Sequence, residues 1–370
     1  MNIGELIKYL DGWVPPGAAW EKDNVGLQAG STAQGIKNIM LCLELDEEVL
    51  KESIQKKCNF IFTHHPLIFN PIKKLDTERN SKAKLIAKVI KNEITVYSAH
   101  TNLDFTKGGV SFELANVLNL KKIRFLELQE SNQFKVVTFI PVESLNKVSD
   151  AVFNAGAGII GEYDNCSFQV NGLGTFKGSK KSNPIVGKKS RIESVNEVRF
   201  EFIVDAWKLN GVIASLKKAH PYEEPAYDVY PLKNKNVNYG YGTIGELEKS
   251  MSEKEFLAHV IKSTKATNLK YCTGNKRNVS KVAVCGGAGS DLLNAAIENN
   301  ADAFITADIK YHTYNDAAGK ILLIDAGHYE TEIHSLNVVQ RKIKKFLFNH
   351  QKIKVLKYSG STNPVKFFKP

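Results

Sequence analysis

Along the first third of the chain, apolar and polar residues alternate with two different periodicities, one typical of buried strands and the other of amphipathic helices. Three apolar runs have the length of buried strands, and the segments after them space their apolar residues as amphipathic helices do. The expected strands are 37–45, 59–63 and 94–100, and the expected helices are 46–57, 81–92 and 110–118. This βαβαβα order predicts a mostly parallel sheet with helices on its faces.

The last third repeats the same alternation. Segment 281–300 reads as strand, glycine turn and helix, and it is followed by strands in 301–308 and 320–328 and by a long helix over 335–347. The chain is therefore expected to contain two similar α/β halves that form one core.

Between the halves, the pattern changes to that of an antiparallel sheet. Strand-like alternation occurs in 132–142, 167–176, 197–205 and 227–232, and helical spacing occurs in 144–156 and 209–220. The resulting β-α-β-β-α-β order predicts a small inserted α+β domain of ferredoxin-like type. Because a domain boundary is expected where composition and periodicity shift together, the expected divisions are 1–124, 125–245 and 246–370.

Composition restricts the class of protein without selecting a function. With 43% hydrophobic and 24% charged residues, the 370-residue chain is typical of a globular, non-membrane protein, and no apolar stretch is long enough to span a bilayer. Neither a basic flank nor an apolar run of signal-peptide type begins the chain. The five cysteines form no CxxC pair, which argues against a disulfide framework and favours a cytoplasmic protein.

The net charge of +11 raises the question of a nucleic-acid partner. The densest basic groups lie at 177–191, 271–278 and 340–346, and none of them interleaves aromatic residues as a base-stacking surface does. A solvated basic surface is the first interpretation, and a phosphate-bearing partner such as a nucleic acid is the second.

Two adjacent histidines, His64 and His65, close the apolar run 59–63. They are expected at the carboxyl end of a buried strand, where open α/β sheets bind their ligands. Neighbouring residues of an extended chain point to opposite sides, so the pair suits two different metal ions better than one.

Further potential ligands follow other predicted strands. Asp104 comes after strand 94–100 and offers two oxygens that can bridge two cations, while His328 and Glu332 share a face if a helix begins after Gly327. Each histidine alone is more often a strand-end or helix-surface residue. Several strands ending in such residues favour a metal site for zinc first, with iron or manganese as alternatives.

The chain resembles a known family in six motifs that occur in the expected order. These are DNVGLQAG (23–30), FTHHPLIF (62–69), HTNLDF (100–105), GGAGSDLL (286–293), ADAFITADIKYH (301–312) and GHYETE (327–332). They resemble the dinuclear metal-centre family of YbgI and YqfO type, also called Nif-three-like or GTP cyclohydrolase I type 2 homologues. Segment 219–232 is similar to the insert of the longer, YqfO-like members, whose fold resembles the trimeric PII and CutA signalling proteins.

The resemblance implies two divalent metal ions per chain. It assigns them to the residues matching His64, His65, Asp104, His328 and Glu332. It also implies a toroidal homohexamer whose metal sites face an internal cavity.

Other polar residues in these motifs are candidates for supporting roles. His100, Asp308 and His312 are expected as acid/base groups or as residues that orient the ligands, because a metal-bound histidine usually needs a partner on its other nitrogen. Residues 23–24 line the site or only form a turn, and the turn is slightly favoured. The glycine-rich run 286–291 lacks the order of a phosphate-binding loop.

Two classes of function remain open. The first is a metal-dependent hydrolase acting on a nucleotide or another small molecule, in which Asp104 bridges the two ions and a nearby group moves protons. The second is a metal chaperone or regulator without catalysis, in which the inserted domain senses a small molecule.

Overall fold

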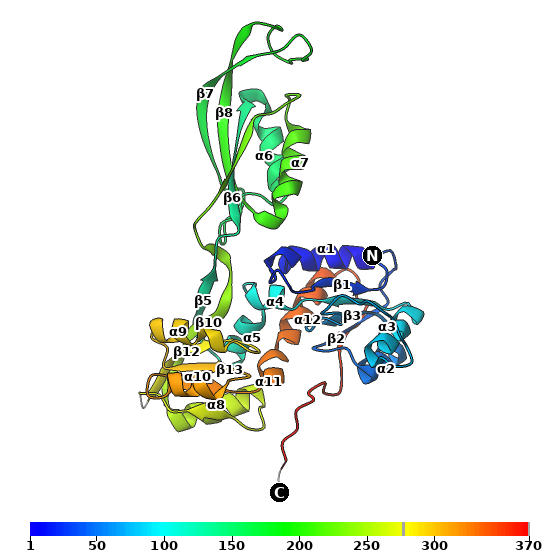
Figure 1. Ribbon diagram of the computed structural model, residues 1–370, viewed down its shortest axis with the longest axis vertical. Helices are drawn as coiled ribbons and strands as arrows, with labels where there is room; N and C mark the ends of the chain where they lie inside the picture. The colour runs from blue at the N-terminus through cyan, green and yellow to red at the C-terminus, as the bar shows by residue number, and fades with distance from the viewer. Residues whose placement is uncertain (276–277, 369–370) are drawn as a thin grey trace. The chain divides into compact units, whose positions relative to one another are not determined.

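The chain forms two units, and residues 1–275 and 278–368 are described in this computed structural model (Figure 1). One unit combines Met1–Glu127 with Tyr239–Pro370, and the other is Leu128–Asn238. The described residues contain no helix that is long and apolar enough to cross a membrane. Of the three basic groups, 271–278 falls partly outside the described residues, at positions 276–277.

The first sheet of the larger unit is mostly parallel, as predicted. Its strand order is β1-β4-β3-β2-β15, and only β1 runs antiparallel to its neighbour. The strands are β1 (Gly26–Ala29), β2 (Asn38–Cys42), β3 (Cys58–Thr63), β4 (Thr95–Ser98) and β15 (Val355–Lys357). The helices of this half are α1 (Ile3–Trp13), α2 (Glu47–Gln55), α3 (Ser81–Lys91), α4 (Thr101–Phe105) and α5 (Val110–Val117).

Local sequence accounts for where the longer of these helices begin. The side chains of Asn2, Asp46 and Asn80 each accept a hydrogen bond from a backbone N–H of the first turn of α1, α2 and α3. Strand β3 is buried at every position, as expected for a parallel strand covered on both faces.

The second sheet is less parallel than its sequence pattern suggested. Its order is β11-β14-β13-β12-β10-β5, with parallel pairing only between β12 and β13 and between β13 and β14 among the recorded pairs. The strands are β5 (Lys121–Gln129), β10 (Asn236–Ser252), β11 (Lys270–Cys272), β12 (Asn278–Val284), β13 (Ala303–Thr306) and β14 (Leu322–Asp325). The helices are α8 (Glu253–Thr264), α9 (Leu293–Glu298), α10 (Tyr311–Ala317), α11 (His328–Glu332) and α12 (Ser335–Phe346).

The two halves repeat one order of elements but exchange their last helices. Elements α1 to α5 follow the order α-β-β-α-β-α-β-α-α, and α8 to α12 follow the same order. Helix α5 belongs to the core of the second sheet with α8, whereas α12 and β15 belong to the core of the first sheet with α1. Each of these two hydrophobic cores therefore contains residues from both 1–124 and 246–370.

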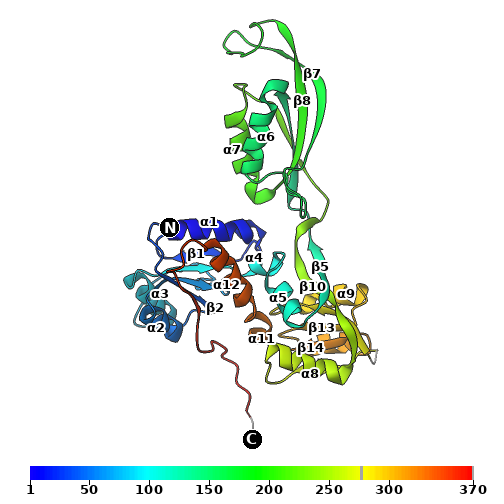
Figure 2. The ribbon, with the colours of Figure 1, turned by 180° about the vertical axis from the view of Figure 1, so that it is seen from behind.

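The smaller unit has the predicted β-α-β-β-α-β order (Figures 1 and 2). Its elements are β6 (Gln133–Pro141), α6 (Leu145–Asn154), β7 (Ser167–Lys177), β8 (Ile192–Asp205), α7 (Leu209–Ala219) and β9 (Tyr227–Pro231). The antiparallel sheet has the order β7-β8-β6-β9, and both helices cover the same face of it. The smaller unit spans fewer residues than the expected 125–245. Most of β5 and β10 belongs to the larger unit, where these strands are part of the second sheet.

Candidate metal centre

The candidate ligands lie at strand ends and on two short helices. His64 and His65 follow β3, and Asp104 lies on α4 just after β4. His328 and Glu332 begin and end α11, which follows β14. The parallel strands thus present their carboxyl ends to the same site, as open α/β sheets commonly do.

Glu332 is the centre of the cluster. Its Oε1 lies 3.0 Å from Nε2 of His328 and 3.6 Å from Nε2 of His64, and its Oε2 lies 3.1 Å from Nε2 of His65. Asp104 Oδ1 lies 3.6 Å from His64 Nε2. Glu332 is therefore the carboxylate that lies between several imidazoles, whereas Asp104 lies beside His64. The bridging role that the sequence suggested for Asp104 stays a prediction.

The outward ring nitrogens of the histidines face acceptors. Nδ1 of His64 donates to the carbonyl of Ala99 at 2.8 Å, and Nδ1 of His328 donates to Asp308 at 2.6 Å. Nδ1 of His65 lies 3.4 Å from Glu44. A proton on Nδ1 leaves the lone pair on Nε2, which is the arrangement of metal-binding histidines.

The inward atoms lack the partners that buried polar groups need. His64 Nε2, Asp104 Oδ1 and Glu332 Oε2 are buried and have no hydrogen-bond partner in the described chain. The separations of 3.0–3.6 Å between these nitrogen and oxygen atoms match the roughly 3.4 Å between two ligands of one tetrahedral ion with bonds of about 2.1 Å. The residues present therefore fit a divalent metal.

Electrostatics without a metal show how strongly these groups interact. Burial would raise the pKa of Glu332, but the surrounding imidazoles, His64 first, hold it well below its usual range. Burial would lower the pKa of His65, but Glu332 and Glu44 outweigh it and raise that pKa to about 10. The hydrogen bond to Glu332 raises the pKa of His328 to about 9. Glu332 and the imidazoles around it therefore stabilise each other's charged forms.

The loop after β12, which contains the glycine-rich run 286–291, packs closely against Glu332 and His328. Gly287 has a φ of +66°, and a Cβ at this position would lie 2.3 Å from Glu332 Oε1 and 3.3 Å from His328 Nε2. Its N–H donates to Thr331 on α11. The glycine-rich run 286–291 therefore brings backbone close to the ligands, a role that the sequence alone did not suggest.

The structure brings all five predicted ligands together, with two of the three supporting residues beside them. Asp308 contacts His328, and a ring nitrogen of His100 lies within 4.8 Å of ring nitrogens of His64 and His65. His312 is exposed on α10, with its ring against Tyr311, and no contact recorded among the described residues joins it to the cluster.

Two neighbouring carboxylates were missed or undervalued by sequence reasoning. Glu44 follows β2, and no sequence motif marked it as part of the site. Its contact with His65 depends on the pairing of β2 with β3. Asp23 was expected in a turn, but it accepts hydrogen bonds from His100 and Thr101.

A cavity of about 490 Å³ lies beside the cluster, within the larger unit. His65, His328 and Asp308 line it together with Tyr329 and Phe367. Its size is that of a site for a small organic molecule. A ligand in this cavity would therefore lie next to His65 and His328.

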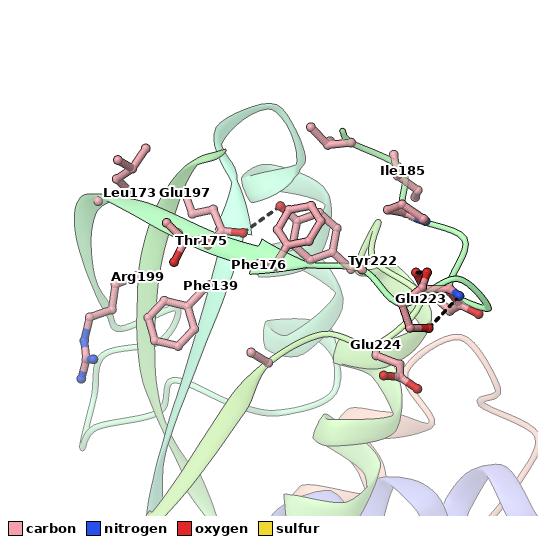
Figure 3. Close-up of a pocket in the computed structure, with 18 of the residues that line it drawn as sticks. Phe139, Leu173, Thr175, Phe176, Ile185, Glu197, Arg199, Tyr222, Glu223 and Glu224 are labelled. Atoms are coloured by element: carbon pink, nitrogen blue, oxygen red, sulfur yellow. Dashed lines mark hydrogen bonds between the residues drawn. The ribbon is translucent and has the colours of Figure 1, made fainter. Parts of the chain in front are cut away.

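The smaller unit contains a separate cavity of about 780 Å³ (Figure 3). Aromatic and acidic side chains share its lining, namely Phe139, Phe176, Tyr222, Glu197, Glu223 and Glu224. The hydroxyl of Tyr222 donates to Glu197 at 2.7 Å, and the backbone N–H of Asn183 donates to Glu223 at 3.0 Å. These bonds fix two of the carboxylates in place.

Comparison with known proteins identifies relatives along the whole chain. The model of the Duf34/NIF3 (NGG1p interacting factor 3) family matches residues 1–364. Proteins named GTP cyclohydrolase 1 type 2 homolog from Halalkalibacterium halodurans and Bacillus subtilis are 36% and 35% identical, over 99% of both chains in each case. The crystal structure of a Bacillus cereus protein related to NIF3 has a TM-score of 0.84 at 36% identity, covering 100% of this chain and 99% of that one.

Proposed function

Because the chain belongs to the Duf34/NIF3 family, we propose that it binds two divalent metal ions and uses them to hydrolyse a small molecule, a nucleotide first of all. The observation that carries this proposal is the position of Glu332. Its carboxylate lies within 3.6 Å of three imidazoles, and buried atoms of this cluster, such as His64 Nε2 and Asp104 Oδ1, have no hydrogen-bond partner in the described chain. The nucleotide follows from the name of the relatives, GTP cyclohydrolase 1 type 2 homolog.

Two ions would divide these ligands between them, with Glu332 within reach of both. His64 and Asp104 would hold one ion, and His65 and His328 would hold the other. Zinc fits this set of nitrogens and carboxylates best, with iron or manganese as alternatives. When bound, such ions supply Lewis acidity and acidify a water molecule at neutral pH.

The chain's own residues would orient the ligands and move protons. Asp308 fixes the ring of His328 through Nδ1, and it also lines the cavity of about 490 Å³ beside the cluster. Its side chain is 58% exposed, so it can exchange protons with solvent. We assign Asp308 as the group that takes a proton from water or gives one to the leaving group.

Turnover of a nucleotide panel by metal-reconstituted protein tests this proposal. His65→Ala should abolish hydrolysis, while the matched variant His350→Ala, at an exposed position, should retain it. Asp308→Asn should bind the ion held by His328 about 10- to 100-fold more weakly, and at saturating metal it should still lose most of the turnover. If no nucleotide or phosphoester is hydrolysed by protein that carries its metals, the hydrolase assignment is wrong.

A binding protein without catalysis is the second candidate, and the cavity in the smaller unit favours it. The β-α-β-β-α-β order of that unit supports a ferredoxin-like module, and the resemblance of segment 219–232 suggests the PII and CutA type. A small molecule bound near Glu197 and Tyr222 would make the unit a sensor. Metabolites that raise the melting temperature of the full chain, but not of Glu197→Gln, would support this function; retention of the effect in His65→Ala would separate it from the metal centre.

We further propose a cytoplasmic homohexamer. Closed symmetric assemblies are the norm among soluble oligomers, and the family resemblance indicates six copies. Light scattering should give a mass of about six chains. A monomer at micromolar concentration would contradict this assembly while leaving the metal assignment intact.

A further inference from the structure

We propose that His100 is a sixth protein ligand and binds the ion held by His64 and Asp104. The inference rests on the proposed pair of metals and adds a residue to it. Without His100, that ion would have one nitrogen ligand, whereas its neighbour would have two. The evidence comes from the position of the ring, its hydrogen bonds and the internal repeat of the fold.

The ring of His100 lies as close to the cluster as those of the other histidines. Its centroid is 5.3 Å from that of His64 and 5.5 Å from that of His65, and His65 and His328 are likewise 5.5 Å apart. Ring nitrogens of His64, His65 and His100 all lie within 4.8 Å of one another, as do ligand atoms of His65, His328 and Glu332. Because His65 is assigned to the neighbouring ion, His64 and His100 are the members of the first group that remain for the ion beside Asp104.

A buried carboxylate fixes the orientation of this ring. Nδ1 of His100 donates to Asp23 at 3.0 Å, and the Asp23 side chain is only 2% exposed. The N–H and hydroxyl of Thr101 also donate to Asp23, which prevents the carboxylate from turning away. With Nδ1 occupied, Nε2 is the nitrogen left for a metal, as with ligating histidines that have a carboxylate partner.

The internal repeat places His100 in the same position as His328. His100 precedes α4, directly after β4, with Asp104 four residues later; His328 begins α11, shortly after β14, with Glu332 four residues later. Each of the two histidines has an aspartate on Nδ1, Asp23 in one half and Asp308 in the other. Two equivalent histidines with equivalent partners point to equivalent roles.

Cobalt-substituted protein gives a direct count of ligating imidazoles. Each histidine that binds Co²⁺ through Nε2 contributes one strongly shifted, solvent-exchangeable Nδ1–H signal to the proton NMR spectrum. Four such signals are expected, from His64, His65, His100 and His328, and His100→Gln should remove one. Three signals in the wild type, unchanged in His100→Gln, would show that His100 is not a ligand.

Affinity measurements distinguish this inference from the proposed function. Chelator competition should show one of two Zn²⁺ ions bound at least tenfold more weakly in His100→Gln, and Asp23→Asn should weaken the same ion by about 10- to 100-fold. His350→Ala is the control. If the wild type binds no metal, the proposed function fails; if His100→Gln keeps both ions with unchanged affinity and cobalt spectrum, only the role of His100 fails, and an acid/base role remains for it.

Discussion

Glu332 determines the character of the site at the scale of single residues. It is 3% exposed and touches three imidazoles, so its charge is compensated only by protonated histidines or by metal ions. The sequence predicted the five candidate ligands, which the structure brings together, because each follows a predicted strand or lies on the short helix expected after Gly327. It could not predict that Glu332 lies between three imidazoles, since that depends on how α11 is placed against His64 and His65.

The contact between Gly287 and Glu332 gives a prediction at this scale. In Gly287→Ala, the new Cβ would lie 2.3 Å from Glu332 Oε1, so the carboxylate must move and metal affinity should fall at least tenfold. Gly108→Ala is a matched control, because Gly108 also has a positive φ, +78°, but open space around its Cβ position. Equal metal affinity in the two variants by chelator competition would remove the supporting role of the loop.

Metal binding should depend on pH because protons compete for the same nitrogens. His65, with a pKa of about 10, and His328, with a pKa of about 9, are protonated at neutral pH in the metal-free protein. Metal must displace these protons, so affinity should rise as pH increases from 6 to 9, by about tenfold per pH unit for each proton released. Titration calorimetry in buffers of different ionisation enthalpy measures this release, and an affinity that is constant over the range would contradict it.

At the scale of elements, periodicity predicted where most strands and helices lie, but not which sheet each helix packs against. The buried runs around β2, β3, β13 and β14 and the amphipathic helix α12 lie where the pattern placed them. The exchange of α5 and α12 between the halves was not predictable, because an apolar helix face does not specify which of two similar sheets it covers. The sequence did not predict the contacts of Asp23 with His100 and of Glu44 with His65 for a related reason, since each contact joins segments that are distant in the sequence.

The exchanged helices are joined by an ion pair whose removal should destabilise the fold. Arg341 on α12 donates two hydrogen bonds to Glu113 on α5, at 3.1 and 2.6 Å, and Glu113 is 5% exposed. Arg341→Met leaves this buried carboxylate without its charged partner and should lower the free energy of unfolding by about 1–3 kcal/mol. Denaturant unfolding should show no comparable loss for Lys344→Met, an exposed neighbour on α12, and equal losses would mean that the ion pair is not the cause.

At the scale of the whole molecule, we expect the metal centre to form without the smaller unit. All proposed ligands lie in Met1–Glu127 and Tyr239–Pro370, and β5 and β10, which lead into and out of Leu128–Asn238, are neighbours in one sheet. Replacing 128–238 by a short turn should therefore give a folded protein that binds as much metal per chain as the full protein. Loss of metal from a folded deletion variant would show that the smaller unit shapes the site.

The number of metal ions per chain tests the central claim most directly. Elemental analysis of protein prepared with excess divalent metal and then freed of unbound ions should give two ions per chain. Glu332→Gln should give none or only trace amounts, because both of the proposed ions would share that carboxylate. A wild-type protein with every ligand intact that retains only trace metal would contradict the account.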